Sequence, residues 1–538
     1  MTFREKLLFI LLTFSITLGV NADLVNLNTI LDRDLAYAKK HLDYLIAANY
    51  NIDYLDAKKD LDMAYDLAGN IGKMGEVFLR RSRIKLEDFW LKASYSMPAT
   101  TRMAYLSADE FKRKILAKDL KGYLTQLAAL GFNGVIAETM QRDGTAIYPN
   151  IKLEQFRLLQ GSDPIKELAL YAKELDLDLF LVMDLGFAAE GGVIPAVATK
   201  YPDWVAISEA GGIFDSQNRI YLNFIHPEVR KYYLDMALEL VDYNIKGLIL
   251  RIDLPSYLKS VNDYSYDAYS RKLFEQQYGY DPMKEKGKPR QEWDVWRKEQ
   301  LNSLVGLITR RVGIAKPSVK MGALLVLDDL DLEGLELDKH LDWETWLNRG
   351  YIQYFLPQIH RREQFINIAK KFLGVKGDFL CYPFLFREED LSLTDFLCTI
   401  NEIQLGGGIV LGNLDIYDQI TLDALQKGPF KKRTLPLHRD FWRALMLNFS
   451  ELEAQAPENY LVDLRNLNDY LSKLVMAPPG AAYKEILALV RKLFNYLEVK
   501  ALAGETAFEK RMLNELNIGR HLLQLGVLQR NSQGKKLY

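Results

Sequence analysis

Short apolar runs alternate with amphipathic helical patterns between about residues 102 and 417. Eight apolar runs predict strands, namely Met103–Ser107, Asn133–Glu138, Leu177–Leu185, Gly247–Asp253, Lys320–Leu327, Ile352–Ile359, Phe379–Phe386 and Gly408–Leu414. Between them, helical spacing predicts Phe111–Leu130, Asp163–Leu175, Pro227–Tyr243, Trp293–Val312, Trp343–Asn348, Gln364–Leu373 and Leu393–Gln404. Strands that are apolar on both faces and alternate with helices are typical of a closed parallel barrel. We therefore predict the α/β class and a (β/α)₈ TIM barrel.

A doubly wound open sheet is the alternative to a barrel. No glycine-rich phosphate loop follows the first predicted strand, which disfavours that alternative. Two connections of the predicted barrel are long: Gly186–Tyr221 after the third strand and Leu254–Glu292 after the fourth. Loops that follow barrel strands form the active-site face, and loops of this length are usually functional.

Helical patterns flank the barrel on both sides. Apolar residues recur at helical spacing from Leu24 to Ala48, and a second pattern runs from Asp53 towards Lys85. Beyond Pro436, four further segments are helical in pattern: Arg439–Leu452, Tyr460–Leu474, Ala482–Leu502 and Phe508–Leu528. The predicted organisation is a helical hairpin at 23–95, a barrel at 96–430 and a C-terminal helical bundle at 431–538.

The first residues have the pattern of a secretory signal peptide. Arg4 and Lys6 precede an uncharged apolar stretch from Leu7 to Val20, and cleavage after Ala22 would leave Asp23 at the mature N-terminus. We predict a signal peptide at 1–22, a secreted or periplasmic location, and no membrane span after cleavage. An uncleaved N-terminal anchor is the alternative.

Composition excludes some partners. The chain of 538 residues has a formal net charge of -2, which provides no global field to hold nucleic acid. Its two cysteines, Cys381 and Cys398, have no Cys or His neighbour at ligand spacing, so we expect two buried thiols. We predict neither a metal site nor a cofactor.

An ordered series of short motifs within the barrel carries a family resemblance. These motifs are Leu130-Gly131-Phe132-Asn133, Ala146-Ile147-Tyr148, Asp163-Pro164-Ile165, Pro202-Asp203-Trp204, Tyr221-Leu222-Asn223, Pro227-Glu228-Val229-Arg230, Tyr243-Asn244-Ile245-Lys246-Gly247 and Pro357-Gln358-Ile359. In this order they resemble the glycosyl-hydrolase-like family ten, a group of exported bacterial proteins related in fold to the amylase-type barrels. The resemblance implies chemistry on a carbohydrate polymer of the cell envelope, with peptidoglycan glycan strands as one candidate.

The sequence departs from this family at the strand ends. The family's adjacent aspartates on the fourth strand are replaced by Arg251 and Ile252, and an acid follows only at Asp253. Other replacements are Phe180 for a His, Asp184 for an Asn, Leu185 for a Pro, Glu138-Thr139-Met140 for Gln-x-Arg, Gln353 for an Asp and His360 for a Tyr. These departures leave catalytic activity in doubt.

Glycoside hydrolysis needs two carboxyl groups beside the scissile bond, and in a barrel they come from the C-terminal ends of different strands. Glu138, Asp184, Asp253 and Asp328 have suitable positions. We predict Asp253 as the central catalytic residue and Glu138 as the proton donor, although a lone acid at Glu138 could instead hold a hydroxyl or cap a loop. Asp184 is more plausible as a binding group, and Asp328 begins an acidic loop.

Arg251 and Asp253 point to the same side of the predicted strand, since strand side chains alternate. If that side is the lumen, the guanidinium could lower the pKa of Asp253 and keep it ionised. The alternative is a structural ion pair that closes the barrel mouth.

Aromatic and polar side chains complete the predicted saccharide site. Aromatic rings of the long loops could stack on pyranose rings, or could simply pack the loops onto the barrel. The predicted substrate-binding residues are Arg251, Asp184, Tyr148, Trp204, Asn223, Tyr257, Gln358 and His360.

Two functions follow from this reading. The first is a glycoside hydrolase that acts on an envelope or extracellular polysaccharide. The second is a catalytically inactive saccharide-binding or scaffolding protein derived from such an enzyme. Two carboxylates facing each other across an open cleft would favour the enzyme, and a cleft closed by Arg251 would favour binding.

Overall fold

The computed structural model describes residues 29–71, 75–150, 152–255, 263–284, 290–326, 339–360, 364–365, 367–368, 375, 378–386, 393–404, 406–412, 414–478 and 480–534. The predicted signal peptide, Tyr257 and Asp328 lie outside these residues. Among the helices of the described ranges, none has the length and apolar character needed to cross a membrane.

The strands form a closed parallel barrel, as predicted. Their bounds are β1 Thr101–Leu106, β2 Gly134–Glu138, β3 Asp178–Ala189, β5 Gly247–Asp253, β6 Lys320–Leu325, β7 Tyr354–Ile359, β8 Leu380–Cys381, β9 Phe384–Phe386 and β10 Gly408–Gly412. Neighbours run in the order β2-β1-β10-β9-β7-β6-β5-β3, and β3 also pairs with β2. Since β8 and β9 share one position, the barrel has eight strand positions.

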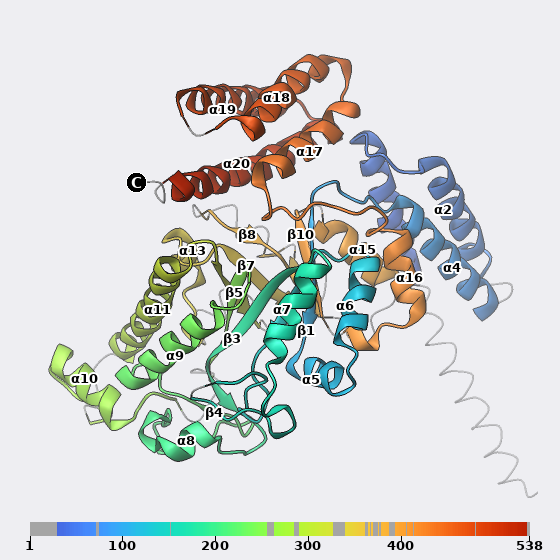
Figure 1. Ribbon diagram of the computed structural model, residues 1–538. Coiled ribbons are helices and arrows are strands. Elements are labelled where there is room, and N and C mark those ends of the chain that lie inside the picture. The colour runs from blue at the N-terminus through green and yellow to red at the C-terminus, as the bar shows by residue number, and fades with distance from the viewer. Residues whose placement is uncertain are drawn as a thin grey trace, which may run out of the picture.

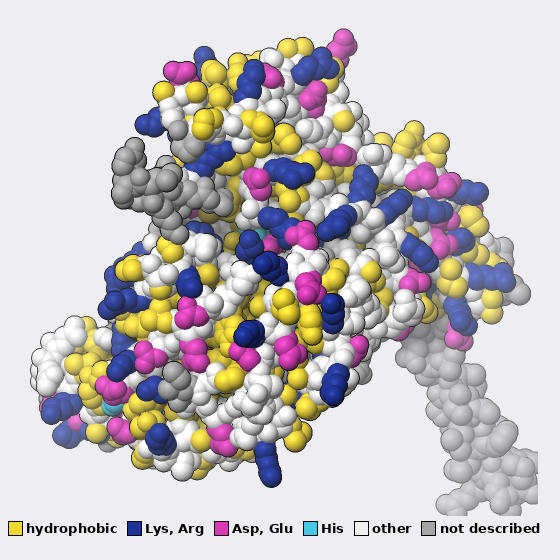
Figure 2. Space-filling model, viewed as in Figure 1, with side chains coloured by type: hydrophobic (Ala, Val, Ile, Leu, Met, Phe, Trp, Pro, Cys, Tyr) yellow, Lys and Arg dark blue, Asp and Glu magenta, His cyan; other side chains and the backbone are white. Residues whose placement is uncertain are grey.

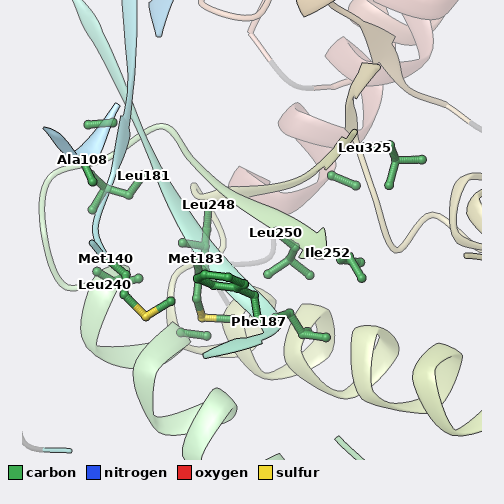
Figure 3. Packing of buried hydrophobic residues seen from close by; sticks show 14 of the residues in the cluster. Ala108, Met140, Leu181, Met183, Phe187, Leu240, Leu248, Leu250, Ile252 and Leu325 are labelled. Carbon is green, nitrogen blue, oxygen red and sulfur yellow. The ribbon is translucent and has the colours of Figure 1, made fainter. Parts of the chain in front are cut away.

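Side chains alternate between the lumen and the surrounding helices. Leu181 and Met183 of β3, with Leu248 and Leu250 of β5, point outwards into the largest hydrophobic cluster, which Figure 3 shows beside the helices. The residues that alternate with these along the strands, such as Phe180, belong to a second cluster that fills the lumen. This alternation explains why the strands are apolar on both faces.

Two strands differ from the prediction for local reasons. The predicted strand Phe379–Phe386 is divided into β8 and β9, because Pro383 has no N–H to donate to a ladder. Strand β3 extends beyond Leu185 and pairs antiparallel with β4 (Ile220–Tyr221) outside the barrel. The bend occurs at Gly186, whose φ of 97° suits glycine, and whose Cβ would lie 2.5 Å from Leu254 Cδ2.

The barrel helices mostly match their predicted positions. They are α7 Pro164–Glu174, α9 Pro227–Leu240, α11 Arg290–Ala315, α13 Trp343–Asn348 and α15 Leu393–Gln404, with α8 Ala196–Lys200 and α10 Ala268–Tyr278 in the two long connections. The predicted helix Phe111–Leu130 is divided into α5 (Ala108–Leu116) and α6 (Leu120–Ala129), since Lys118 adopts a φ of 56°. Helix α16 (Gln419–Lys427) was not predicted. Parts of the predicted helix Gln364–Leu373 lie outside the described residues.

The N-terminal helices pack against the side of the barrel. A helix at 29–47 is followed by α2 (Tyr54–Ala68) and α4 (Glu76–Ala93), so the second helix of the predicted hairpin is two helices. Their core includes Leu397 and Cys398 of α15, and the Tyr37 hydroxyl donates to Glu402 of that helix. Cys398 is not joined to Cys381 by a disulfide.

The C-terminal bundle covers the end of the barrel where the strands begin. It consists of α17 (Phe441–Ala454), α18 (Glu458–Met476), α19 (Ala481–Leu502) and α20 (Ala507–Gly534). Figure 1 shows the bundle above one end of the barrel, with β4 and α8 at the opposite end. The bundle and the lumen share one hydrophobic cluster. The mouth, formed by the strand C-terminal ends, therefore lies at the end of the barrel away from the bundle.

Candidate functional site

The guanidinium of Arg251 lies at the centre of the charged groups inside the mouth. Its Nε donates to Asp184 Oδ1 at 2.5 Å, and its Nη1 donates to Glu138 Oε1. The Tyr105 hydroxyl donates to the same Glu138 oxygen at 2.6 Å, and the backbone N–H of Ala108 donates to Glu138 Oε2 at 2.8 Å. One arginine thus holds carboxylates from β2 and β3 together.

This cluster is buried. Relative exposures are 4% for Glu138, 2% for Asp184 and 8% for Arg251. Burial alone would lower the pKa of Arg251, but the charges of Asp184 and Glu138 outweigh it and hold that pKa well above its ordinary value. Burial raises the pKa of Asp184, and Arg251 offsets this only in part. Both acids are therefore bonded to a guanidinium that stays charged.

Asp253, the predicted central residue, takes different partners. Its carboxylate lies 3.3 Å from Arg219 Nη1 and 3.8 Å from Lys339 Nζ. The predicted pairing of Asp253 with Arg251 is replaced by this arrangement, in which Arg251 bonds to Glu138 and Asp184. The side chain of Asp253 is 18% exposed, so it is more accessible than the other two carboxylates.

A turn holds Arg219 in place beside Asp253. Asp215 Oδ1 accepts from the Arg219 backbone N–H at 2.8 Å, and Asp215 Oδ2 accepts from Arg219 Nε at 2.8 Å. The Tyr221 hydroxyl also donates to Asp215 Oδ2, at 2.9 Å. Burial alone would raise the pKa of Asp215, but these hydrogen bonds and the Arg219 charge outweigh it and lower that pKa.

On the opposite side of the mouth, the described residues of β7 and β9 are aromatic and polar. Gln358 Nε2 lies 3.2 Å from His360 Nε2, and the His360 ring lies 6.1 Å from the ring of Phe386. The ring of Tyr105 stacks on Phe384 with centroids 4.6 Å apart. Gln358, His360 and Phe386 are all partly exposed. The mouth therefore combines hydrogen-bonding groups with an apolar surface, as saccharide sites do.

Three predicted substrate-binding residues are buried in packing contacts. Tyr148 is fully buried, and its hydroxyl accepts from Asn150. Trp204 is 5% exposed and stacks on Tyr201 at 4.2 Å, while Asn223 donates to Asp267 and Ser270. All three side chains are thus engaged in contacts within the protein, and their role in substrate binding stays a prediction.

Several residues of the mouth were missed in the sequence. Arg219 and Lys339 come from long connections, where no periodic pattern fixes side-chain direction. Tyr105 and Phe386 have a signal that could have found them, because they occupy the last inward-facing positions of β1 and β9.

Within the described ranges, no group of three or more His, Cys, Asp or Glu residues is arranged to hold a metal ion.

Three of the solved structures that match the chain are distant in sequence and longer than it. An alpha-galactosidase from Lactobacillus brevis is 12% identical with a TM-score of 0.43, and the match covers 69% of this chain and 44% of that one. GH36 alpha-galactosidase AgaA from Geobacillus stearothermophilus is 11% identical with a TM-score of 0.42, covering 66% and 45%. Alpha-L-fucosidase isoenzyme 2 from Paenibacillus thiaminolyticus is 13% identical with a TM-score of 0.41, covering 62% and 49%. The chain spans less than half the length of each of these structures.

No curated protein matches the chain. A family model does: the model described as Glycosyl hydrolase-like 10 matches residues 102–372, from β1 to beyond β7. That match includes every strand end that supplies Glu138, Asp184, Arg251 and Asp253. Because it covers half of the 538 residues, the chain belongs to the glycosyl hydrolase-like 10 family.

Proposed function

We propose that this chain is an exported saccharide-binding protein that uses the mouth of a glycoside-hydrolase-like barrel without cleaving its ligand. The observation that carries this proposal is the position of Arg251 between Glu138 and Asp184. Hydrolysis needs one carboxyl group to donate a proton and another to attack or to activate water. Here two of the three described strand-end acids are buried and bonded to one permanent cation.

The accessible part of the mouth is suited to holding a sugar. Phe386 offers an aromatic face for the apolar side of a pyranose ring, while Gln358, Asp253 and Arg219 offer donors and acceptors for hydroxyl groups. The ligand class we favour is a polysaccharide of the cell envelope or the extracellular space. The location, secreted or periplasmic, is part of the proposal and depends on the signal-peptide pattern of residues 1–22.

Hydrolysis is the second candidate, because Asp253 retains access to solvent. In that reading Asp253 acts as the nucleophile or base, and a second carboxyl group must be released from Arg251 when the ligand binds. The two candidates differ in one observable, the formation of products.

The test uses the full chain and the Asp253→Asn and Phe386→Ala variants. Each is incubated with a panel of polysaccharides and peptidoglycan glycan strands, products are measured by mass spectrometry, and binding is measured by calorimetry. We expect binding without products, and about 5- to 150-fold weaker binding for Phe386→Ala, since a lost aromatic contact costs about 1–3 kcal/mol. Leu170→Ala removes an exposed apolar side chain from α7 and serves as the control. Products from the parent but not from Asp253→Asn would establish the hydrolase instead, and absence of binding to the whole panel would refute the proposal.

A further inference from the structure

A cluster of cations lies at the opposite end of the barrel, where the bundle meets the strand N-terminal ends. We name Lys246, Lys320, Arg433 and Arg439 the basic junction. Arg439 contacts Asp176 Oδ2 at 2.7 Å and Asp178 Oδ2 at 3.3 Å. Arg433 lies 3.5 Å from Asp176, and Lys246 lies 4.0 Å from Asp178. The backbone N–H of Lys320 donates to the carbonyl of Lys246, so Lys320 adjoins this chain of contacts.

The charges of the basic junction do not balance within the cluster. Three of the four cations share two carboxylates, and among the described residues the ammonium group of Lys320 contacts the Pro317 carbonyl, at 3.4 Å. Burial lowers the pKa of Lys320, since no acid among its described contacts stabilises the charged form. Asp440, at the start of the bundle, accepts from the Arg443 backbone N–H as the N-cap of α17. The cluster therefore carries excess positive charge.

The cations are also accessible and anchored. The side chain of Arg433 is 85% exposed and that of Lys246 is 55% exposed. They come from two well-separated segments, the loop before β5 and the chain that enters the bundle, and both segments are fixed by backbone contacts with the barrel. Figure 2 shows lysine and arginine side chains along the hollow between the bundle and the barrel. A cluster in which cations outnumber carboxylates attracts an anionic ligand.

We infer that the basic junction is a second binding site, which takes an anionic polysaccharide along the hollow between barrel and bundle. The hollow between barrel and bundle suits a narrow chain, whereas a bilayer surface or a DNA duplex is broad and would contact the outer faces of both parts. Arginine forks and lysine ammonium groups both bind carboxylate or phosphate substituents of such a chain. This site lies at the other end of the barrel from the mouth, and its existence does not depend on the proposed function.

The test measures binding of the full chain to polygalacturonate, which has a carboxylate on every sugar, and to neutral dextran, over a range of salt concentrations. We expect salt-dependent binding to polygalacturonate. The double variant Lys246→Ala/Arg433→Ala should bind at least about tenfold more weakly, and its slope of log affinity against log salt should fall by about 1 for each cation removed. Lys231→Ala/Lys272→Ala removes two exposed lysines of α9 and α10 and is the matched control.

Further measurements separate the alternatives. Both double variants should keep the parent's unfolding midpoint, because the altered side chains are exposed. Phe386→Ala should leave polygalacturonate binding unchanged; a parallel loss would place the polymer at the mouth and refute a second site. No binding, equal binding to dextran, an equal loss in the control variant, or tighter binding to phosphatidylglycerol vesicles or duplex DNA would also overturn the inference.

Discussion

The carboxylate of Asp178 and the imidazole of His438 lie in contact inside the N-terminal opening of the barrel, with Oδ2 3.0 Å from Nε2. Their positions in the chain differ by 260 residues. The other ring nitrogen of His438, Nδ1, lies 3.4 Å from Thr101 Oγ1 and 3.3 Å from the Tyr382 hydroxyl. Rings of Phe180 and Tyr354 enclose the imidazole at 5.2 and 5.7 Å. A buried polar contact of this kind joins the bundle to the barrel as one unit.

Replacement of His438 should therefore destabilise both parts together. We expect His438→Ala to lower the free energy of unfolding by about 2–4 kcal/mol, since it removes a buried ring and leaves Asp178 without one of its partners. Urea denaturation followed by far-UV circular dichroism and by tryptophan fluorescence measures this change. A loss below about 0.5 kcal/mol would mean that the contact contributes nothing, and separate transitions for the two probes would mean that the bundle unfolds independently.

Glu515 should make stability depend on pH. It is 5% exposed on α20, and burial raises its pKa from 4.5 to about 7, with Arg511 offsetting the shift only in part. An acid whose pKa is raised by folding binds its proton more tightly in the folded state, so its contribution is fully present below pH 4.5 and is lost as pH rises through about 7. We expect a loss of about 2–4 kcal/mol across that window. Glu515→Gln should remove this part of the slope in chemical denaturation at several pH values, and an unchanged slope would contradict the assignment.

Removal of the Arg251 side chain should lower the free energy of unfolding. Arg251→Met leaves Glu138 and Asp184 buried without their cation, and breaking a buried ion pair costs about 3–5 kcal/mol. The thermal unfolding midpoint measures this loss. Arg465→Met is the comparison, because its pair with Glu453 is exposed and such pairs contribute about 0–1 kcal/mol. Equal effects of the two variants would show that burial of the Arg251 cluster has no energetic role.

Gly247 should not tolerate a side chain. A Cβ at this position would lie 2.6 Å from Cδ1 of Phe180 and 3.0 Å from the Lys320 carbonyl oxygen, which is backbone. We expect Gly247→Ala to destabilise by about 1–3 kcal/mol through overpacking. Gly313→Ala on helix α11 meets nothing within 4 Å and should stabilise by up to about 1 kcal/mol. Denaturation of both variants under one condition tests the pair, and an unaffected Gly247→Ala protein would show that the lumen can expand.

The periodicity of the sequence was sufficient for the barrel but not for its details. Each strand is buried on both faces, so its apolar run stands out, and the predicted Gly247–Asp253 is the observed β5. The break at Pro383 depends on one missing N–H, and the division of β8 from β9 was overlooked although proline signals it. Helix α16 was missed because the sequence was interpreted as irregular after the last strand.

The site was predictable only where the alternation of side chains along a strand determines which way a residue points. Asp184 and Arg251 are register partners on adjacent strands, and with Glu138 they were placed correctly at the strand C-terminal ends. Which acid Arg251 binds depends on how far its side chain reaches across the lumen. We predicted that it would pair with Asp253, and in the structure it bonds to Glu138 and Asp184. Arg219 and Lys339 come from irregular segments, whose direction is set by tertiary contacts such as those of Asp215.

The glycines of the lumen determine how a polymer can approach this barrel. At Gly247, Gly322 and Gly408, the space that a Cβ would need is taken by Phe180, Ile249 and Tyr382 respectively. These side chains and the inserted His438 fill the axis between the mouth and the bundle. The barrel is thus closed along its axis and has no channel through the lumen. A glycan strand could rest across the rim of the barrel, but it could not thread through the filled lumen, so any polymer bound at the mouth must be held from that side alone.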